Sequence, residues 1–313
     1  MTSPLVAPVL QTERITILDS LRGFAILGIL LMNIPGFALP DPAAYGDLSV
    51  MNEIGTPNFK VWYGIDWFLE GSQRALFSML FGAGIILFIT GKEKKAEGLW
   101  PADYFFRRQL WLLVFGLFNA FILLWFWDIL FHYAVLGLVA FAFRRQSAKF
   151  LMIGALVFLF LQTARDNVDA YRERKVITKG EAIAKMDTTV TKLTDVQKEE
   201  LGAMTAFKER STAKAKAERM KKSLAAVQGS YPNFYNYQSE RSVRGELFYT
   251  YYGFGDILLM MFLGMAFFKN GWITGQASAK VYWALFVVGL GLGLVLSYFR
   301  LQPYIEYNFN QFD

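Results

Sequence analysis

The chain has 313 residues, a formal net charge of +6 and no cysteine, and 54% of its residues are hydrophobic. A soluble protein of this length is rarely so apolar, and the lack of cysteine excludes a disulfide framework and any cysteine metal site. Nothing resembles a nucleic-acid-binding fold, and membrane topology explains the basic balance better. We therefore expect an all-α polytopic membrane protein whose partner is the lipid bilayer, with no nucleic acid and no metal site.

The apolar segments predict about seven transmembrane helices, because each reaches or approaches the length that crosses a bilayer core of roughly 30 Å. The predicted spans are residues 16–35, 69–90, 105–125, 128–143, 148–164, 246–268 and 280–300. They predict an N-terminal membrane bundle of five spans, a helical insertion and a C-terminal hairpin of two spans. The corresponding ranges are 1–164, 165–245 and 246–313.

Positively charged residues in the short loops predict the orientation in the membrane. Eleven fall on one side and two on the other: Arg14, Lys92, Lys94, Lys95, Arg107, Arg108, Arg144, Arg145, Lys149, Lys269 and Lys280 against Lys60 and Arg300. The first side is cytoplasmic by this rule, and it holds the N-terminus. We expect a multi-pass protein of the bacterial inner membrane, in which residues 35–68 form a periplasmic loop and residues 165–245 a periplasmic helical insertion.

The insertion carries a helix start signal. In Thr194-Asp195-Val196-Gln197, a threonine is followed three residues later by a glutamine, which is the pattern of a capping box. We expect one helix from Asp195 to about Gln228, ended by Gly229 and Pro232. Its interior has few large apolar residues, so a solvated helix or helical hairpin is expected rather than a core domain.

Three polar residues, Asp19, Arg22 and Asn33, interrupt the first span. Asp19 and Arg22 are three residues apart and can pair on a helix. Asn33 is eleven residues beyond Arg22, three turns plus about 20°, so all three share one stripe. Such a stripe suits a helix that faces protein or water. The alternative is an interfacial Asp–Arg pair and a helix-terminal asparagine.

The only histidine, His132, follows Asp128 by four residues, so both lie on one helical face about 6 Å apart in rise. An aspartate that orients a histidine is a candidate general base. The alternative is a histidine that satisfies a neighbouring carboxylate and does no chemistry. Asp256 stands at the start of the sixth span, where we expect it to cap the helix.

Glycine spacing predicts two helix-packing faces. Gly82 and Gly84 allow close approach in the second span, and Gly289 and Gly293 have the GxxxG spacing in the seventh. In the second span, Arg74 is also four residues from Glu70 and can pair with it.

The segment Leu18–Gly23 reads LDSLRG, and with its continuation to Ile34 it resembles the opening of the YeiB-like family of inner-membrane proteins. That family is similar to the heparan-α-glucosaminide N-acetyltransferase group and, more distantly, to the type-three membrane acyltransferases. Residues 74–84 resemble the family's arginine followed by LFSxLFGxG, and residues 128–138 resemble its DILxxYAxxGL pattern. The family pattern continues for three or four further spans, so we expect a shortened relative or a fragment.

The resemblance implies a transmembrane acyltransferase that moves an acyl group from cytoplasmic acyl-CoA to a periplasmic glycan or lipid. The implied site residues are His132, Asp128 and Asn33 for catalysis and Asp19, Arg22 and Arg74 for substrate binding. In this interpretation cations meet the donor phosphates, the asparagine stabilises an oxyanion and the histidine supplies base chemistry. The alternatives are a non-enzymatic transporter or carrier with a polar path, and a membrane scaffold whose periplasmic helix binds a partner.

Overall fold

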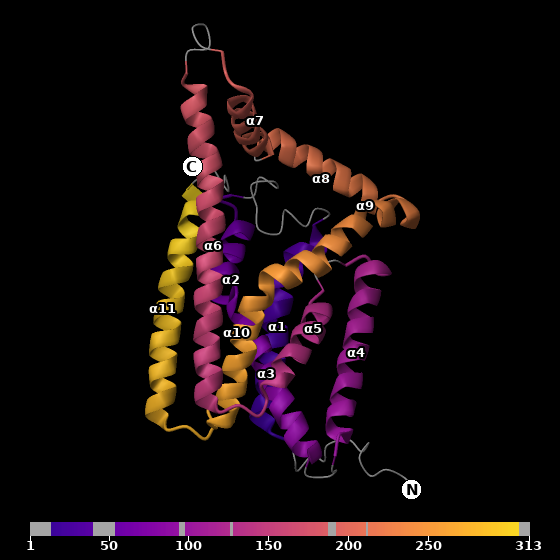
Figure 1. The fold of residues 1–313 in the computed structure, drawn as a ribbon, viewed down its shortest axis with the longest axis vertical. Coiled ribbons are helices and arrows are strands. Elements are labelled where there is room, and N and C mark those ends of the chain that lie inside the picture. The colour runs from indigo at the N-terminus through magenta and orange to yellow at the C-terminus, as the bar shows by residue number, and fades with distance from the viewer. Residues whose placement is uncertain are drawn as a thin grey trace. The chain divides into compact units, whose positions relative to one another are not determined.

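The computed structural model describes residues 14–39, 54–93, 98–125, 128–186, 192–210 and 212–306, and within these ranges it contains helices and no strands (Figure 1). The α-helices are α1 (Thr16–Ala38), α2 (Pro57–Leu69), α3 (Ser72–Glu93), α4 (Trp100–Phe121), α5 (Leu130–Ala142), α6 (Ala148–Ala184), α7 (Asp195–Arg210), α8 (Ala213–Val227), α9 (Tyr231–Arg244), α10 (Thr250–Lys269) and α11 (Ala279–Glu306). A π-helical turn, Gly245–Tyr249, joins α9 to α10. The prediction of an all-helical chain is confirmed for these residues.

Five helical segments of the described chain are long and apolar enough to cross a membrane: Thr16–Ala38, Pro57–Glu93, Ala148–Ala184, Tyr231–Lys269 and Ala279–Pro303. The count of about seven is therefore not confirmed, although every predicted span coincides with a helix. The two others are α5, a short apolar helix, and α4, whose N-terminal half carries Arg107, Arg108 and Gln109. These polar residues lower its mean hydropathy.

Two segments differ from the predictions. Residues 35–68, expected to be a loop, contain α2. The single helix expected from Asp195 to Gln228 is divided into α7 and α8, because Thr212 adopts an extended backbone and caps α8. Its hydroxyl oxygen accepts a hydrogen bond from the Ala215 amide at 3.2 Å. Threonine competes with the helical backbone in this way, which favours a new helix start over continuation.

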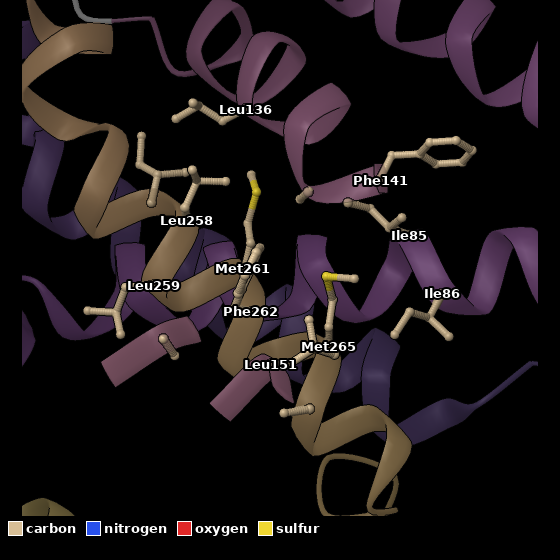
Figure 2. Packing of buried hydrophobic residues seen from close by; sticks show 14 of the residues in the cluster. Ile85, Ile86, Leu136, Phe141, Leu151, Leu258, Leu259, Met261, Phe262 and Met265 are labelled. Atoms are coloured by element: carbon tan, nitrogen blue, oxygen red, sulfur yellow. The ribbon is translucent and has the colours of Figure 1, made fainter. Parts of the chain in front are cut away.

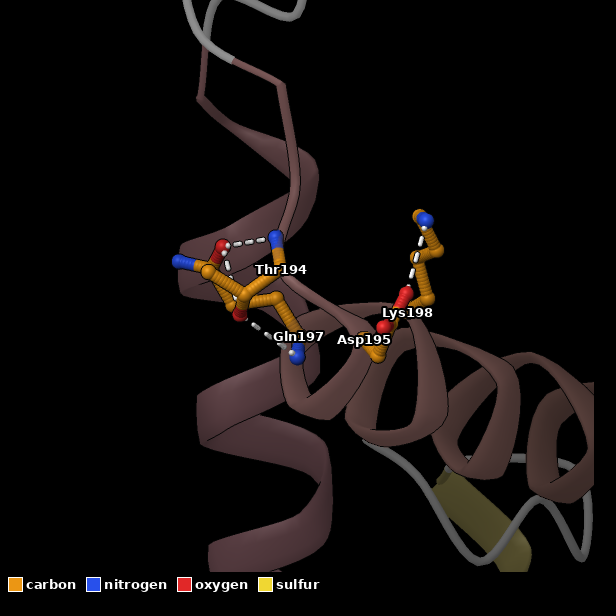
Figure 3. Close-up of polar contacts among 4 residues, drawn as sticks. All are labelled: Thr194, Asp195, Gln197 and Lys198. Carbon is orange, nitrogen blue, oxygen red and sulfur yellow. Dashed lines mark hydrogen bonds and ion pairs between the residues drawn. The ribbon is translucent and has the colours of Figure 1, made fainter.

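The capping box at the start of α7 is confirmed (Figure 3). The Thr194 amide donates to Gln197 Oε1 at 2.9 Å, and the Gln197 amide donates to Thr194 Oγ1 at 3.3 Å. Lys198 also pairs with Asp195 at 2.9 Å. This helix start was predictable because every interacting group lies within five consecutive residues.

The chain divides into two compact units. The first contains residues 1–31, 69–161 and 230–290, and the second contains residues 32–68, 162–229 and 291–313. In the second unit, Lys208 of α7 pairs with Glu181 of α6 at 2.9 Å, and Arg300 of α11 pairs with the buried carboxylate of Asp66 on α2.

The hydrophobic core of the first unit is built around α10 (Figure 2). Met261 and Met265 are completely buried, and they pack with apolar residues of α3, α5 and α6. Phe105 of α4 stacks on Phe141 of α5 with ring centroids 4.5 Å apart, so the N-terminal half of α4 lies beside the C-terminal half of α5. A smaller cluster around Leu18 packs α1 against α3.

The backbones of α3 and α10 touch where they cross. A Cβ atom at Gly82 would lie 2.1 Å from the Met261 carbonyl oxygen, and one at Gly264 would lie 1.9 Å from the Met79 carbonyl oxygen. Only glycine fits at both positions, because a backbone oxygen cannot move aside as a flexible side chain can. The predicted close approach at Gly82 is therefore confirmed, and its neighbour is the backbone of Met261 in α10.

The other predicted glycine contacts differ from this crossing. A Cβ at Gly84 would be in ordinary contact with Arg22 Nη2 at 3.8 Å. At Gly289 and Gly293 of α11, a Cβ would have no described atom within 4 Å. The packing face predicted in the seventh span is therefore wrong for contacts among the described residues, because GxxxG spacing specifies a flat surface and not its partner.

Candidate functional site

A buried polar cluster lies where α4 ends, α5 begins and the π-helical turn precedes α10. We define the buried polar cluster by five residues: Asn119, Asp128, His132, Glu246 and Thr250. Asp128, His132 and Glu246 are 6%, 8% and 2% exposed. Polar side chains buried to this degree within an apolar bundle indicate function more often than stability.

The end of α4 positions the Asp128 side of this cluster. Leu124 has a positive φ of 59° and is buried, and the Trp125 amide donates back to the Asn119 carbonyl at 3.0 Å. Gly116 lets α4 approach the first turn of α5, since a Cβ there would lie 2.6 Å from the Phe131 backbone nitrogen and 3.0 Å from Asp128 Oδ2.

Asp128 serves as a helix-terminal acceptor. Its Oδ1 accepts from Asn119 Nδ2 at 3.1 Å, and its Oδ2 accepts from the Leu130 amide at 3.0 Å. The second bond satisfies an end donor of α5, and the positive end of the helix dipole favours the carboxylate.

The hydrogen-bond partner of His132 is Thr250 and not Asp128, the residue expected from the sequence. Its Nδ1 is hydrogen-bonded to the Thr250 hydroxyl, and among the described residues it makes no hydrogen bond with Asp128. The expected Asp128–His132 pair is therefore wrong as a direct contact. The four-residue spacing misleads because α5 begins at Leu130, so Asp128 precedes the helix and its side chain is directed to the helix end.

The hydroxyl of Thr250 determines the tautomer of His132. Thr250 Oγ1 donates its single proton to the Glu246 carbonyl oxygen at 2.5 Å, so it can only accept from the histidine. Nδ1 of His132 must then carry hydrogen, and Nε2 of the neutral ring carries the lone pair. Nε2 is therefore the atom that can accept a proton.

Glu246 is a cluster member that the sequence interpretation missed. Neither of its carboxylate oxygens has a hydrogen-bond partner among the described residues. It lies in the π-helical turn, a distortion that often marks functional sites in helices. In the sequence, Glu246 stands out only as an acidic residue before the apolar run of α10. It coincides with the predicted domain boundary at residues 245 and 246.

A second polar group connects α3, α5 and α10. Arg74 pairs with Asp256 at 3.2 Å, and Ser78 shares a hydrogen bond with the buried hydroxyl of Tyr133. The prediction that Asp256 caps the sixth span is wrong, since α9 and the π-helical turn continue into α10 ahead of it. Arg74 is 54% exposed, so its guanidinium remains accessible to a ligand.

Asp19 and Arg22 of α1 form the predicted pair, with Arg22 Nη1 2.9 Å from Asp19 Oδ1. The two side chains are 48% and 40% exposed, so this is an exposed pair and not a buried one. Asn33, the third residue of the predicted stripe, lies on the part of α1 that belongs to the second unit. It is not a member of the buried polar cluster.

We predict that Arg22→Ala lowers the free energy of unfolding by only about 0–1 kcal/mol, the range for exposed ion pairs. Chemical unfolding of Arg22→Ala, Asp19→Asn and the double variant would measure the coupling. A loss of 3 kcal/mol or more, the range of buried pairs, would show that the pair is shielded from water.

Basic and aromatic side chains gather at the other end of α4, which we call the basic–aromatic end. Lys92 Nζ lies 5.0 Å from the Tyr104 ring centroid, and the Arg108 guanidinium lies 5.4 Å from that of Phe88. Glu93 of α3 pairs with Arg145, beyond α5, at 3.1 Å. Lys94 and Lys95, also part of the predicted cytoplasmic charge, lie outside the described residues.

Comparison with known proteins gives relatives without an assigned activity. The chain is 37% identical over 164 residues to the uncharacterized protein YxaH of Bacillus subtilis (strain 168), covering 49% of this chain and 38% of that protein. It is 33% identical over 135 residues to the uncharacterized protein YeiB of Escherichia coli (strain K12), covering 43% and 32%. It is also 37% identical over 110 residues to an uncharacterized 39.9 kDa protein of Bacillus acidopullulyticus, covering 35% and 28%.

These relatives are consistent with a YeiB-like family. The matched regions span between 28% and 38% of the relatives' own lengths. No family model matches the chain, and no solved structure matches it. Any activity must therefore be argued from the chain's own residues.

Proposed function

We propose that the protein is a transmembrane acyltransferase that moves an acyl group from cytoplasmic acyl-CoA to a periplasmic glycan or lipid. The observation that supports this proposal most directly is the hydrogen bond that makes His132 Nδ1 a donor, because it leaves Nε2 of the neutral ring as the proton acceptor inside an apolar bundle. A histidine held in one tautomer is the group that general-base catalysis requires.

The two ends of α4 suit two parts of such a reaction. Arg108 at the basic–aromatic end can pair with donor phosphates, and Asn119 near the other end belongs to the buried polar cluster. Eleven residues of helix separate them, which corresponds to about 16 Å of rise. A donor whose phosphates bind at one end would extend its thioester toward the histidine.

In the proposed step, His132 Nε2 takes the proton of the acceptor hydroxyl or amine as that atom attacks the thioester carbonyl. The new bond to the acyl carbon forms, the carbon–sulfur bond breaks, and the imidazolium returns its proton to the departing CoA thiolate. Arg22 and Arg74 are the proposed substrate-binding cations, and Asp128 supports the start of α5 that carries His132.

The test uses the purified chain in proteoliposomes with acetyl-CoA as the donor probe. Extracted membrane lipids and cell-wall glycan fragments are supplied as acceptors, and a thiol reagent reports released CoA. We expect CoA release that saturates with acetyl-CoA and needs an acceptor. A transporter, carrier or scaffold would release no CoA above empty liposomes, and that result would contradict the proposal.

The proposed route requires the basic–aromatic end to be cytoplasmic. We predict that reporters fused after Gly98 and after Arg145 behave as cytoplasmic, and that one fused within residues 180–220 behaves as periplasmic. The charge asymmetry of the short loops supports this orientation, as does the Glu93–Arg145 pair that joins two of the predicted cytoplasmic segments. A cytoplasmic signal from residues 180–220 would overturn the orientation.

A further inference from the structure

Glu246 is a buried carboxyl group, and no described residue would compensate its negative charge when it is ionised. Its side chain is 2% exposed, neither carboxylate oxygen has a hydrogen-bond partner, and no described lysine or arginine forms an ion pair with it. The other carboxylate of the buried polar cluster, Asp128, lies just before α5, and His132 of α5 is hydrogen-bonded to Thr250, four residues beyond Glu246. Buried charges in proteins are paired, hydrogen-bonded or bound to a cation, so an ionised Glu246 requires a partner that the described residues do not supply.

A single positive charge would neutralise an ionised Glu246. Asp128, the other carboxylate of the buried polar cluster, is already stabilised by Asn119 and by the first turn of α5. Only Glu246 is left without compensation. A monovalent ion would balance the site, whereas a divalent ion normally has more acidic ligands.

Protonation would stabilise the buried side chain of Glu246 less well than a bound metal cation would. A protonated carboxyl group gains a hydroxyl that must itself donate, and neither oxygen has a hydrogen-bond partner among the described residues. A buried donor without an acceptor costs about 1–3 kcal/mol. A cation between Glu246 and Asp128 would interact with both carboxylates, because each oxygen of Asp128 retains acceptor capacity beyond the one bond it makes.

The surrounding groups are oxygen ligands of the kind that hard cations prefer. The Thr250 hydroxyl donates to the Glu246 carbonyl oxygen, so both oxygen atoms belong to the segment that carries the Glu246 carboxyl group. The π-helical turn interrupts regular helical bonding at this point, and interrupted membrane helices offer backbone carbonyls to Na⁺ in the same way.

We propose that Glu246 and Asp128, with the oxygen atoms of the π-helical turn, form a binding site for a monovalent metal cation, Na⁺. The bound ion would connect the start of α10 to the turn between α4 and α5. The site does not depend on acyl transfer, and the tests measure cation binding alone.

The first experiment measures binding of ²²Na⁺ to the full chain in detergent, together with its melting temperature in NaCl, KCl and choline chloride at equal ionic strength. We expect saturable ²²Na⁺ binding and a melting temperature that rises with Na⁺ by about 3 °C at a tenfold excess over Kd. Glu246→Gln should lose both effects. In choline chloride its melting temperature should equal or exceed that of the wild type, because the uncompensated charge is gone.

Two further variants keep the proposal falsifiable if Glu246→Gln fails to fold. Asp128→Asn should raise the Na⁺ concentration at half-saturation several-fold. Glu181→Gln, the same change at an exposed residue paired with Lys208, should bind ²²Na⁺ like the wild type. Equal melting temperatures in all three salts, Na⁺ binding that survives Glu246→Gln, or stability that responds to pH and not to Na⁺ would overturn the proposal.

Discussion

Gly264→Val should unfold the first unit or lower its free energy of unfolding by at least about 3 kcal/mol, the upper end of the range for overpacked cores. A Cβ atom at this position would lie 1.9 Å from the Met79 carbonyl oxygen. Relief would require α10 to move away from α3, which would expose the buried face that holds Met261 and Met265. Thermal unfolding in detergent, followed by tryptophan fluorescence, would measure the loss.

Gly293→Val in α11 is the matched control for this substitution. It makes the same chemical change within a membrane-length helix, but a Cβ there has no described atom within 4 Å. We expect a change within about 0.5 kcal/mol, as for surface positions without special contacts. If the two variants melt alike, the α3–α10 crossing is looser than the structure describes.

The contrast between these glycines shows which part of the fold could be predicted. Apolar runs predicted the helices well, because whether a segment is helical depends on residues within a few turns. The capping box at Thr194 was predictable for the same reason. By contrast, spacing favoured Gly289 and Gly293 as a packing face, whereas the close backbone contacts lie at Gly82 of α3 and Gly264 of α10.

The site was only partly predictable for the same physical reason. His132 and Asp128 were found because they are close in sequence, but the partner of His132 is Thr250, which lies far along the chain. Arg74 likewise meets Asp256 of α10. Glu246 was missed because a single glutamate beside an apolar run is common. Its significance depends on burial and on the absence of a described partner, and both require tertiary structure.

His132→Ala should lower acyl transfer by about 10²–10⁴-fold, the contribution expected of a general base, while the chain remains folded. Folding should survive because Thr250 keeps its donation to the Glu246 carbonyl, so no buried hydroxyl loses its acceptor. The measurement is CoA release from acetyl-CoA at saturating donor, alongside the melting temperature of the same preparation.

Thr250→Val tests whether the rate loss in His132→Ala comes from losing the base or from a general disruption of the buried polar cluster. Valine matches threonine in shape but has no hydroxyl, so the hydrogen bond that fixes His132 with hydrogen on Nδ1 is lost while the imidazole stays. We expect a smaller fall in rate than for His132→Ala, since part of the population keeps Nε2 as the acceptor. Transfer at the wild-type rate in the His132 variant would remove His132 from the mechanism, because no other described residue of the cluster is assigned the role of base.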